Sequence, residues 1–392
     1  MPSEFHLECI ECGTAFPASR ERLVCSLCAS KQQTGGPVRG CLELRYDFLP
    51  KSYPNELHAE AWKDWFPLQM EPLRTGLLVG GTPLHSAPRL REHLGLNALF
   101  VKDDTRNPSA STKDRASWLV CQKAKEFHFS TVATASTGNA ASALACMCAA
   151  FDLNCKLFVP KDAPPAKLHQ MRAFGADLCL VDGDYDDAFE ASMQACLSEN
   201  YYNRNTAYNP YTIEGKKGAS LEIMAQLYPS GADAIIVSAG DGVILHGLIR
   251  GLQDLIQAGL IKQMPRVIAV QSHLSNALWK AWKTRNPKDA LCKNANSVCD
   301  SLNVNAPRNA YGALKALQIC GGEIISVSDE AILEAILLLA RKTGIFAEPA
   351  GAAALAGCMQ ALSDGLLQKK ERVVLLVTGS GLKDPAAAQS LF

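Results

Sequence analysis

The stretch Asn107-Pro-Ser-Ala-Ser-Thr-Lys113-Asp-Arg115 places a lysine where a loop turns into a helix. It follows an apolar run with a polar end, Asn97-Ala-Leu-Phe-Val-Lys-Asp-Asp104, and it precedes a helical pattern over residues 116–124. The Ser/Thr pair before the lysine can cap that helix. A lysine amine becomes a Schiff-base nucleophile when a low-dielectric pocket or a nearby cation lowers its pKa. Most lysines are solvated surface charges, so the interpretation of Lys113 depends on the motifs that follow.

A second motif, Ser136-Thr137-Gly138-Asn139, follows a β-rich run at 130–135 and opens an alanine-rich helix. Small residues let the backbone approach a ligand closely, and the N–H groups at a helix N-terminus suit a carboxylate. The asparagine side chain can hydrogen-bond a phenolic oxygen that lies across the loop. Taken alone, the motif is more simply interpreted as an ordinary capped strand-to-helix turn.

A third motif is a glycine-rich loop between an apolar strand and a helix, with the residues Gly240, Asp241, Gly242, Val243 and Ile244. Such a loop cradles a phosphate with backbone N–H groups and the helix dipole. Its spacing is neither the Walker form nor the full dinucleotide fingerprint, so by itself it indicates only some phosphate.

A fourth motif ends another buried-looking strand in small, hydroxyl-bearing residues, Thr378-Gly-Ser380-Gly-Leu-Lys-Asp384. A neutral hydroxyl can hydrogen-bond an unprotonated pyridine nitrogen without forcing it to become cationic. Just upstream, Phe346-Ala-Glu348-Pro349 places a glutamate at the entry to another helix of small residues.

In this order, Lys113-Asp-Arg115, Ser136–Asn139, Phe346–Pro349 and Thr378–Pro385 resemble the threonine synthase group of the fold-type II pyridoxal-phosphate enzymes, in the tryptophan synthase β-like superfamily. The resemblance covers about residues 75 to 392. It implies pyridoxal 5'-phosphate as the cofactor, and we expect a homodimer.

The resemblance also assigns roles to residues. Lys113 is implied to be the catalytic lysine that binds the cofactor covalently and later acts as the general base. Asn139 is implied to contact the cofactor's ring oxygen, and Thr378 to face the pyridine nitrogen. The implied phosphate loop consists of Gly240, Asp241, Gly242, Val243 and Ile244.

The implied activity is that of a pyridoxal-phosphate-dependent lyase of the threonine synthase type. It would convert O-phosphohomoserine and water to threonine and phosphate by elimination and replacement. We expect a small amino-acid substrate whose α-carboxylate docks on the loop Ser136, Thr137, Gly138 and Asn139. The leaving group is expected to lie towards Thr212 and the helix that follows.

The chain departs from the family pattern at three places. Ala140 stands where members commonly carry a threonine, and Thr112 replaces the usual aromatic residue before the lysine. The segment Asn209-Pro-Tyr-Thr212 lacks the arginine that commonly pairs with the substrate phosphate, which is a strong and geometry-specific contact. The nearby Lys216 and Lys217 are expected to be solvated helix surface; the alternative is that they supply the missing charge.

These departures keep two other functions open. One is a related β- or γ-replacement or elimination enzyme that acts on another amino acid, such as a cysteate synthase or a threonine or serine deaminase. The other is a catalytically silent paralogue, against which the presence of Lys113 argues.

Two Cys-x-x-Cys pairs near the N-terminus, Cys9 with Cys12 and Cys25 with Cys28, are separated by a short polar stretch. Four thiolates in this arrangement suit a tetrahedral structural zinc site, which leaves no coordination position open for catalysis. The alternative is a degenerate ribbon with free thiols. The family resemblance extends here, since many threonine synthases carry a similar N-terminal ribbon.

The composition excludes several classes of partner. The formal net charge is zero over 392 residues, and the 20% of charged residues form no basic block, which argues against nucleic acid and anionic membranes. The apolar runs are too short to span a bilayer, and residues 1–8 have no apolar signal core. Fifteen cysteines without a secretion signal indicate reduced thiols and a cytoplasmic location.

Short apolar runs alternate with helical patterns, which predicts an α/β fold with two parallel-sheet domains and an N-terminal zinc-ribbon-like segment. The predicted strands are 130–135, 155–159, 177–181, 234–238, 266–271 and 372–378. We expect a ribbon-like segment at 1–45, an arm and the first part of the large domain at 46–129, a small α/β domain at 130–212, and the remainder of the large domain at 213–392.

Overall fold

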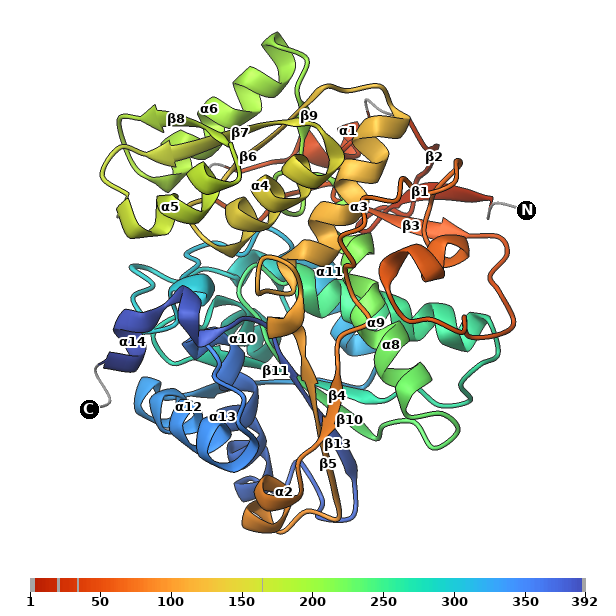
Figure 1. Ribbon diagram of the computed structural model, residues 1–392, viewed down its shortest axis with the longest axis vertical. Helices are drawn as coiled ribbons and strands as arrows, with labels where there is room; N and C mark the ends of the chain where they lie inside the picture. The colour runs from red at the N-terminus through yellow and green to blue at the C-terminus, as the bar shows by residue number, and fades with distance from the viewer. Residues whose placement is uncertain (1–3, 20–21, 34, 164, 390–392) are drawn as a thin grey trace.

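The computed structural model describes residues 4–19, 22–33, 35–163 and 165–389. These residues form three sheets: an antiparallel one near the N-terminus, a four-stranded one and a six-stranded one (Figure 1). Residues 1–3, 20–21 and 34 of the predicted ribbon-like segment, residue 164 of the predicted small domain and residues 390–392 of the last predicted segment lie outside the described residues. The predicted α/β class with two parallel sheets is confirmed.

The four-stranded sheet is parallel throughout and has the order β8-β7-β6-β9. Its strands are β6 (Thr131–Ala135), β7 (Asn154–Pro160), β8 (Asp177–Val181) and β9 (Tyr202–Asn203). The helices between them are α4 (Asn139–Phe151), α5 (Pro165–Ala173) and α6 (Tyr185–Ser198). Every residue of β6 is buried, as expected for a central parallel strand that is covered on both faces.

The six-stranded sheet has the order β12-β11-β10-β13-β5-β4, and only the edge strand β4 runs antiparallel to its neighbour. Its strands are β4 (Leu84–Ser86), β5 (Ala98–Asp103), β10 (Ala234–Ser238), β11 (Arg266–Ser272), β12 (Glu323–Val327) and β13 (Arg372–Val377). The predicted strands therefore exist in both sheets: 177–181 and 234–238 match at both ends, and the ends of the others differ by at most one residue.

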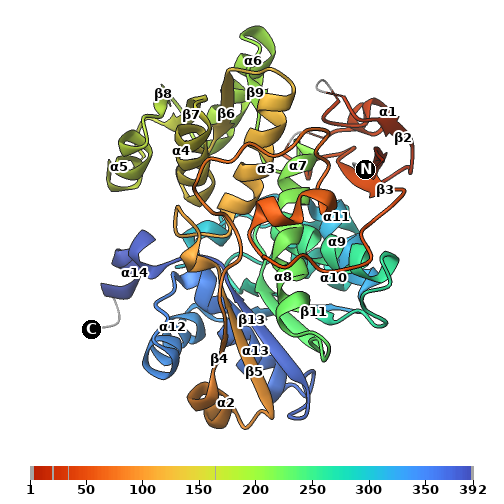
Figure 2. The same cartoon turned by 45° about the vertical axis from the view of Figure 1, so that its right-hand side comes forward.

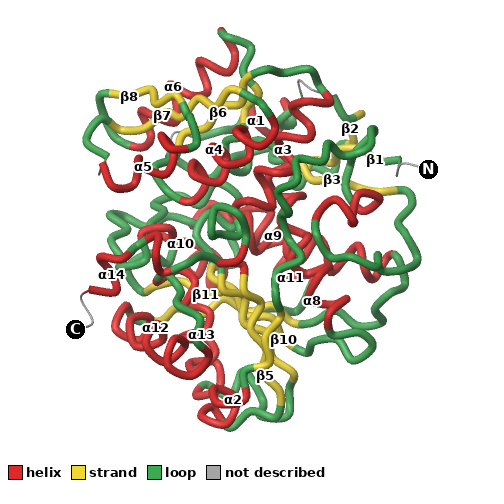
Figure 3. The backbone as a smooth tube through the Cα atoms, viewed as in Figure 1, coloured by secondary structure: helices red, strands yellow, loops and turns green. Residues whose placement is uncertain are grey.

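Helices cover both faces of the six-stranded sheet (Figure 3). Side chains of β13 alternate between two cores: Val374 and Leu376 belong to one, and Val373 and Leu375 belong to the other. This is the two-residue period of a strand buried on both sides. The helices are α2 (Pro88–Leu94), α3 (Lys113–Glu126), α8 (Gly218–Gln226), α9 (Val243–Gln257), α10 (Ala277–Thr284), α11 (Ala310–Ile319), α12 (Asp329–Thr343), α13 (Pro349–Ser363) and α14 (Pro385–Gln389).

The N-terminal sheet has the order β2-β1-β3 and packs against α9 (Figure 2). Its elements are β1 (Phe5–Cys9), β2 (Ala15–Pro17), β3 (Leu42–Tyr46) and the short helix α1 (Ser26–Ala29). On α9, Arg250 Nη2 donates to the Leu44 carbonyl at 3.1 Å, and Gln257 Nε2 donates to the Tyr46 carbonyl at 2.8 Å. The ribbon-like segment is therefore hydrogen-bonded to the large sheet's helical layer.

Short helical segments complete the chain. They are α7 (Pro210–Glu214) and the 3₁₀ turns η1 (Ala59–Trp65), η2 (Asp104–Arg106), η3 (Gly215–Lys217), η4 (Pro287–Asp289), η5 (Asp300–Leu302) and η6 (Gly381–Lys383). Among the described residues, no helix combines the length and the apolar character needed to cross a membrane. The division of the chain at residues 45, 129 and 212 stays a prediction.

Candidate active site

The loop that precedes Lys113 is fastened to the turn that ends β13. The Thr112 N–H donates to the Thr378 carbonyl at 2.8 Å, and the Ser380 N–H donates to the Ala110 carbonyl at 3.1 Å. Lys113 is the first residue of α3, so its position is fixed at the carboxyl edge of the six-stranded sheet. Ligands of open parallel sheets bind at this edge.

The predicted cap of α3 is only partly confirmed. The Thr112 side chain makes no capping hydrogen bond. The Ser111 hydroxyl instead accepts a long hydrogen bond, 3.4 Å, from the Lys113 N–H. The reason is the tie between Thr112 and Thr378, which holds Thr112 in a helical conformation that does not suit an N-cap residue.

The segment before α13 is fastened to the other side of the same turn. The Glu348 N–H donates to the Gly379 carbonyl at 3.1 Å, and the Gly381 N–H donates to the Phe346 carbonyl at 3.0 Å. A side chain at residue 379 would place its Cβ 2.4 Å from Glu348 Oε1. Glycine is therefore required at this position, and the Glu348 carboxylate lies directly against the turn.

Asn139 and Glu348 join the two parallel sheets. Asn139, the first residue of α4, donates from Nδ2 to both carboxylate oxygens of Glu348, at 2.9 and 3.0 Å. Both side chains are buried. Burial raises the pKa of Glu348, while the hydrogen bond from Asn139 and the charge of Lys113 act in the opposite direction. The sequence places Glu348 at the start of a helix but indicates no role for it, because its partner Asn139 is more than two hundred residues away.

The electrostatic surroundings of Lys113 favour the neutral amine. Removal from water lowers the pKa of Lys113, and the charge of Arg204 lowers it further. Glu348 and Asp241 oppose this shift by attracting the ammonium. A lysine with a lowered pKa in a mostly buried setting has the properties of a Schiff-base nucleophile.

The glycine-rich loop leads from β10 into α9 and leaves the N-terminus of that helix open. Gly242 has a φ of +83°, and no side chain caps the helix. The first N–H groups of α9 therefore have no partner within the helix. A side chain on Gly240 would come within 3.2 Å of the Ser301 carbonyl. The loop thus offers a cradle of backbone N–H groups suited to an anion, as the sequence predicts.

Other residues of this loop are held by the segment before α11. The Asn309 N–H donates to the Asp241 carbonyl at 3.1 Å, and the Arg308 N–H donates to Asp241 Oδ1 at 3.2 Å. Val243 is buried and Ile244 is partly buried at the start of α9. The Asp241 side chain therefore supports the shape of the loop.

The loop before α4 presents an open helix N-terminus at the carboxyl edge of the four-stranded sheet, and Asn139 joins this loop to Glu348. Ser136, Thr137 and Gly138 are partly exposed, although β6 before them and α4 after them are buried. The Gly138 N–H donates to Ser136 Oγ at 3.2 Å, and no side chain caps α4. This arrangement can receive a carboxylate. Thr212 lies on α7 and is buried, and its hydroxyl donates to the Asn209 carbonyl at 2.7 Å.

Arg115, the last residue of the first motif, belongs to a buried ionic network. Its guanidinium donates to both oxygens of Asp104, at 2.8 and 2.7 Å, and pairs with Glu222. Lys102 also donates to Glu222, at 2.6 Å. Desolvation opposes ionisation of Asp104, yet the Arg115 charge and hydrogen bonds lower the Asp104 pKa to about 2. The network anchors α3 behind Lys113.

The expectation that Lys216 and Lys217 are solvated helix surface is wrong. Their exposed fractions are 3% and 0%. The physical reason is that η3 is wedged between α3 and α9. A side chain at Gly215 would come within 2.5 Å of the Arg115 carbonyl, and one at Gly247 would come within 2.8 Å of the Lys216 Cβ.

The two lysines have different partners. Lys217 Nζ pairs with Asp254 at 2.8 Å and with Glu214, so its charge is compensated. Lys216 Nζ donates to the Thr212 carbonyl at 2.9 Å. Burial lowers the pKa of Lys216 well below its ordinary value, and the charges of Lys113 and Arg204 add to this effect.

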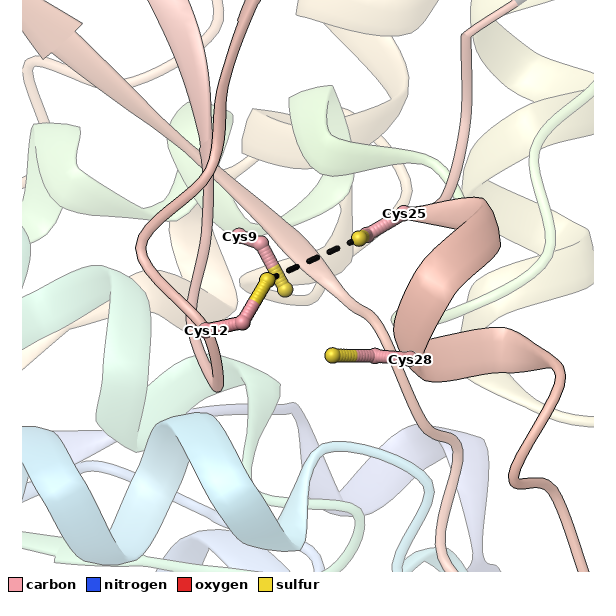
Figure 4. A group of neighbouring side chains, drawn as sticks. All are labelled: Cys9, Cys12, Cys25 and Cys28. Atoms are coloured by element: carbon pink, nitrogen blue, oxygen red, sulfur yellow. Dashed lines mark hydrogen bonds between the residues drawn. The ribbon is translucent and has the colours of Figure 1, made fainter.

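The predicted metal ligands converge. The thiols of Cys9, Cys12, Cys25 and Cys28 all lie within 4.8 Å of one another, between the turn after β1 and the start of α1 (Figure 4). Cys12 Sγ and Cys25 Sγ are 3.8 Å apart. Tetrahedral coordination with metal–sulfur bonds of about 2.3 Å requires sulfur separations of about 3.8 Å. The cluster can therefore bind a metal ion.

A cavity of about 780 Å³ lies away from these motifs, between the four-cysteine segment and the helices α10 and α11. Glu11, Trp282, Tyr311 and Lys315 are among its lining residues. It contains none of the residues that the sequence predicts for cofactor or substrate.

Comparisons with known proteins agree with this geometry. Residues 76–379 match the family model of pyridoxal-phosphate dependent enzymes. Threonine synthase from Methanocaldococcus jannaschii is 32% identical over 97% of this chain and 93% of that protein. Threonine synthase from Methanosarcina acetivorans is 33% identical over the same shares of the two chains.

A solved structure, threonine deaminase isoform 2 from Solanum lycopersicum, superposes with a TM-score of 0.68 at 20% identity, over 79% of this chain and 86% of that one. It shows the shared fold. The chain belongs to the fold-type II pyridoxal-phosphate dependent enzymes, and among them to the threonine synthase family.

Proposed function

We propose that this protein is a threonine synthase that converts O-phosphohomoserine and water to threonine and phosphate by elimination and replacement. The observation that carries the proposal is the convergence of Lys113, the Thr378 turn and the open N-terminus of α9 at one sheet edge. Relatives named threonine synthase, 32% and 33% identical over nearly the whole chain, support the same reaction.

The residues at this edge fit pyridoxal phosphate. Lys113 would bind it covalently, Asn139 would contact its ring oxygen, and Thr378 would face its pyridine nitrogen with a neutral hydroxyl. The backbone N–H groups of Gly240, Asp241, Gly242, Val243 and Ile244 would hold its phosphate. When bound, the cofactor supplies an electron sink for the carbanion that forms at the substrate's α-carbon.

Lys113 is the proposed general base. Its ε-amine, when it does not hold the cofactor, would remove the α-proton of the substrate. The lowered pKa of Lys113 increases the unprotonated fraction of this amine. Glu348, which holds the Asn139 amide and attracts the Lys113 ammonium, is proposed to position both groups.

The substrate's α-carboxylate is proposed to bind at Ser136, Thr137, Gly138 and Asn139, where α4 presents free N–H groups. The leaving group would then lie towards Thr212. Because the segment from Asn209 to Gly215 lacks the expected arginine, a second candidate function is kept: a related β- or γ-replacement or elimination enzyme for another amino acid.

An assay of the purified protein, loaded with pyridoxal phosphate, against O-phosphohomoserine, threonine, serine and O-phosphoserine tests the proposal. We expect threonine and phosphate in equal amounts from O-phosphohomoserine, and no turnover by Lys113→Ala. Turnover of threonine, serine or O-phosphoserine alone would support the second candidate. A protein with neither turnover nor a borohydride-sensitive visible band would be a silent paralogue.

The four-cysteine cluster is proposed to hold a structural zinc ion, since Cys9, Cys12, Cys25 and Cys28 occupy all four tetrahedral positions. The homodimeric state and the cytoplasmic location stay predictions from the sequence.

A further inference from the structure

We propose that Lys216 and Arg204 form a buried oxyanion subsite beside Lys113, and that this subsite binds the distal phosphate of the amino-acid substrate. The inference rests on the proposed function. It assigns binding of the substrate's phosphate to two residues that are not among the predicted substrate-binding residues.

The ammonium of Lys216 is held between the helix that begins at Lys113 and the helix of the glycine-rich loop. The turn η3 contacts the first residues of α3 through Gly215 and the second turn of α9 at Gly247. The Lys216 Nζ donates to the carbonyl of Thr212, the residue expected to face the leaving group. An ammonium has three N–H donors, so one backbone acceptor leaves two of them available for an anion.

Arg204 is a second buried cation, and it lies at the carboxyl edge of the four-stranded sheet. It follows β9, and its N–H donates to the Ala133 carbonyl of β6 at 2.8 Å. Strand β6 continues directly into the loop at 136–139, so Arg204 and that loop share the carboxyl edge of the four-stranded sheet. Arg204 is 1% exposed, and its Nε and Nη2 atoms have no hydrogen-bond partner.

A buried guanidinium with unused donors is costly unless a ligand satisfies them. Arginine donors match the geometry of phosphate oxygens, and a lysine can add a point charge to the same group. Lys216 lies next to the start of α3, because η3 contacts Arg115 and Ala116 at Gly215. The charge of Arg204 acts on both Lys113 and Lys216. Lys217 is excluded from this role because Glu214 and Asp254 already compensate its charge.

Two phosphates could occupy this neighbourhood: that of the cofactor and that of the substrate. The open N-terminus of α9 and the loop around Gly240 already form a backbone cradle for the cofactor's phosphate. Lys216 instead contacts the Thr212 carbonyl, and Arg204 comes from the other sheet. The substrate's phosphate is therefore the better match for this pair.

The subsite should also respond to pH. The charged groups that act on Lys216 are Lys113, Arg204 and Asp241, and together with burial they leave its pKa well below that of a surface lysine. An anion binds the protonated form, so affinity should fall as pH rises through the lowered pKa. Burial lowers the pKa of Arg204 only to about 10, so its charge persists at neutral pH.

The test measures binding of inorganic phosphate to the holoenzyme by calorimetry, together with KM for O-phosphohomoserine. For Lys216→Gln we expect the dissociation constant of inorganic phosphate and the KM for O-phosphohomoserine to rise roughly ten- to a hundredfold. This is the usual loss for one charge-assisted hydrogen bond. Arg204→Lys should weaken phosphate binding less than Arg204→Gln. Lys315→Gln is the matched control, because Lys315 Nζ also donates to one backbone carbonyl, at 2.9 Å, but outside this site.

Lys216→Arg is the control for a folding defect, because it keeps the positive charge and should retain phosphate binding. With inorganic sulfate as the probe, the affinity of Lys216→Arg should not depend on pH, whereas that of the parent should fall as pH rises through the lowered pKa of Lys216. Unchanged phosphate binding in Lys216→Gln would overturn the subsite, and so would absence of phosphate binding by the parent holoenzyme. A tenfold loss of cofactor affinity in Lys216→Gln would show that the subsite binds the phosphate of the cofactor, and it would overturn the assignment to the substrate.

Failure of the proposed function gives a different result. If the parent does not turn over O-phosphohomoserine but binds inorganic phosphate through Lys216, the subsite stands and the reaction is another one.

Discussion

The backbone N–H of Arg308 donates to Oδ1 of Asp241 at 3.2 Å, so a residue before α11 holds the glycine-rich loop. The carbonyl of Arg308 accepts from the Val38 N–H at 3.1 Å, within the N-terminal segment. Its guanidinium pairs with Asp186 at 2.8 Å and lies 3.9 Å from the Phe189 ring centroid on α6. Arg308 thus connects the four-cysteine segment, the proposed phosphate loop and the four-stranded sheet.

Metal removal should therefore weaken cofactor binding without abolishing turnover. The proposed zinc site has no open coordination position, so its effect must pass through packing and hydrogen bonds such as that of Val38 to Arg308. We expect one zinc per chain by metal analysis, and a roughly fivefold to tenfold weaker cofactor affinity after chelation, as for one or two lost hydrogen bonds. A zinc-free enzyme with unchanged cofactor affinity would contradict this connection.

Replacing Glu348 with glutamine should move the pH dependence of turnover. The Glu348 carboxylate raises the pKa of Lys113, so its loss should lower that pKa further. The acidic limb of the kcat profile should shift to lower pH. An unmoved profile in a variant that keeps its visible band would show that Glu348 does not act on Lys113.

Arg115→Met should destabilise the protein by about 3–5 kcal/mol, because it leaves Asp104 and Glu222 buried with one compensating charge fewer. Denaturant unfolding of the apoprotein measures this change. Arg89→Met, at an exposed position of α2, is the control and should change stability by less than about 0.5 kcal/mol. Equal effects of the two substitutions would show that the buried network does not anchor α3.

Asp114 should make stability fall as pH rises. Burial raises the pKa of Asp114 to about 7, so between about pH 4 and pH 7 the folded chain holds a proton that the unfolded chain has lost. The unfolding free energy therefore decreases through this window and levels off above it. Asp114→Asn should flatten that part of the curve, measured as unfolding midpoints from pH 4 to 8. An equal decrease of stability with pH in both proteins would show that groups other than Asp114 cause it.

Much of the candidate site can be predicted from sequence because each motif is a short strand–turn–helix unit. The loops at Gly240 and Thr378 follow buried strands of the six-stranded sheet, and the loop at Ser136 follows a buried strand of the four-stranded sheet. Each loop lies at the carboxyl edge of its own parallel sheet, where ligands bind. The Cys-x-x-Cys pairs are equally local, and their thiols do converge. Local spacing alone suffices for these features.

The rest depends on long-range packing. Nothing near Lys216 indicates that η3 is wedged between α3 and α9, which is why its burial was not predicted. The Asn139–Glu348 hydrogen bond joins residues from two different sheets. Arg204 carries no local motif, and its significance comes from two buried guanidinium nitrogens, Nε and Nη2, that have no hydrogen-bond partner. Such features follow from tertiary contacts that a single sequence does not reveal.

The most direct test of the central claim is to reduce the holoenzyme with borohydride and locate the modified lysine by peptide mass mapping. Lys113 should carry the cofactor, because it alone begins the helix fastened to the Thr378 turn, and Lys113→Ala should lose the borohydride-sensitive visible band. Modification at another lysine, such as Lys216, with Lys113 unmodified, would contradict the assignment of this site.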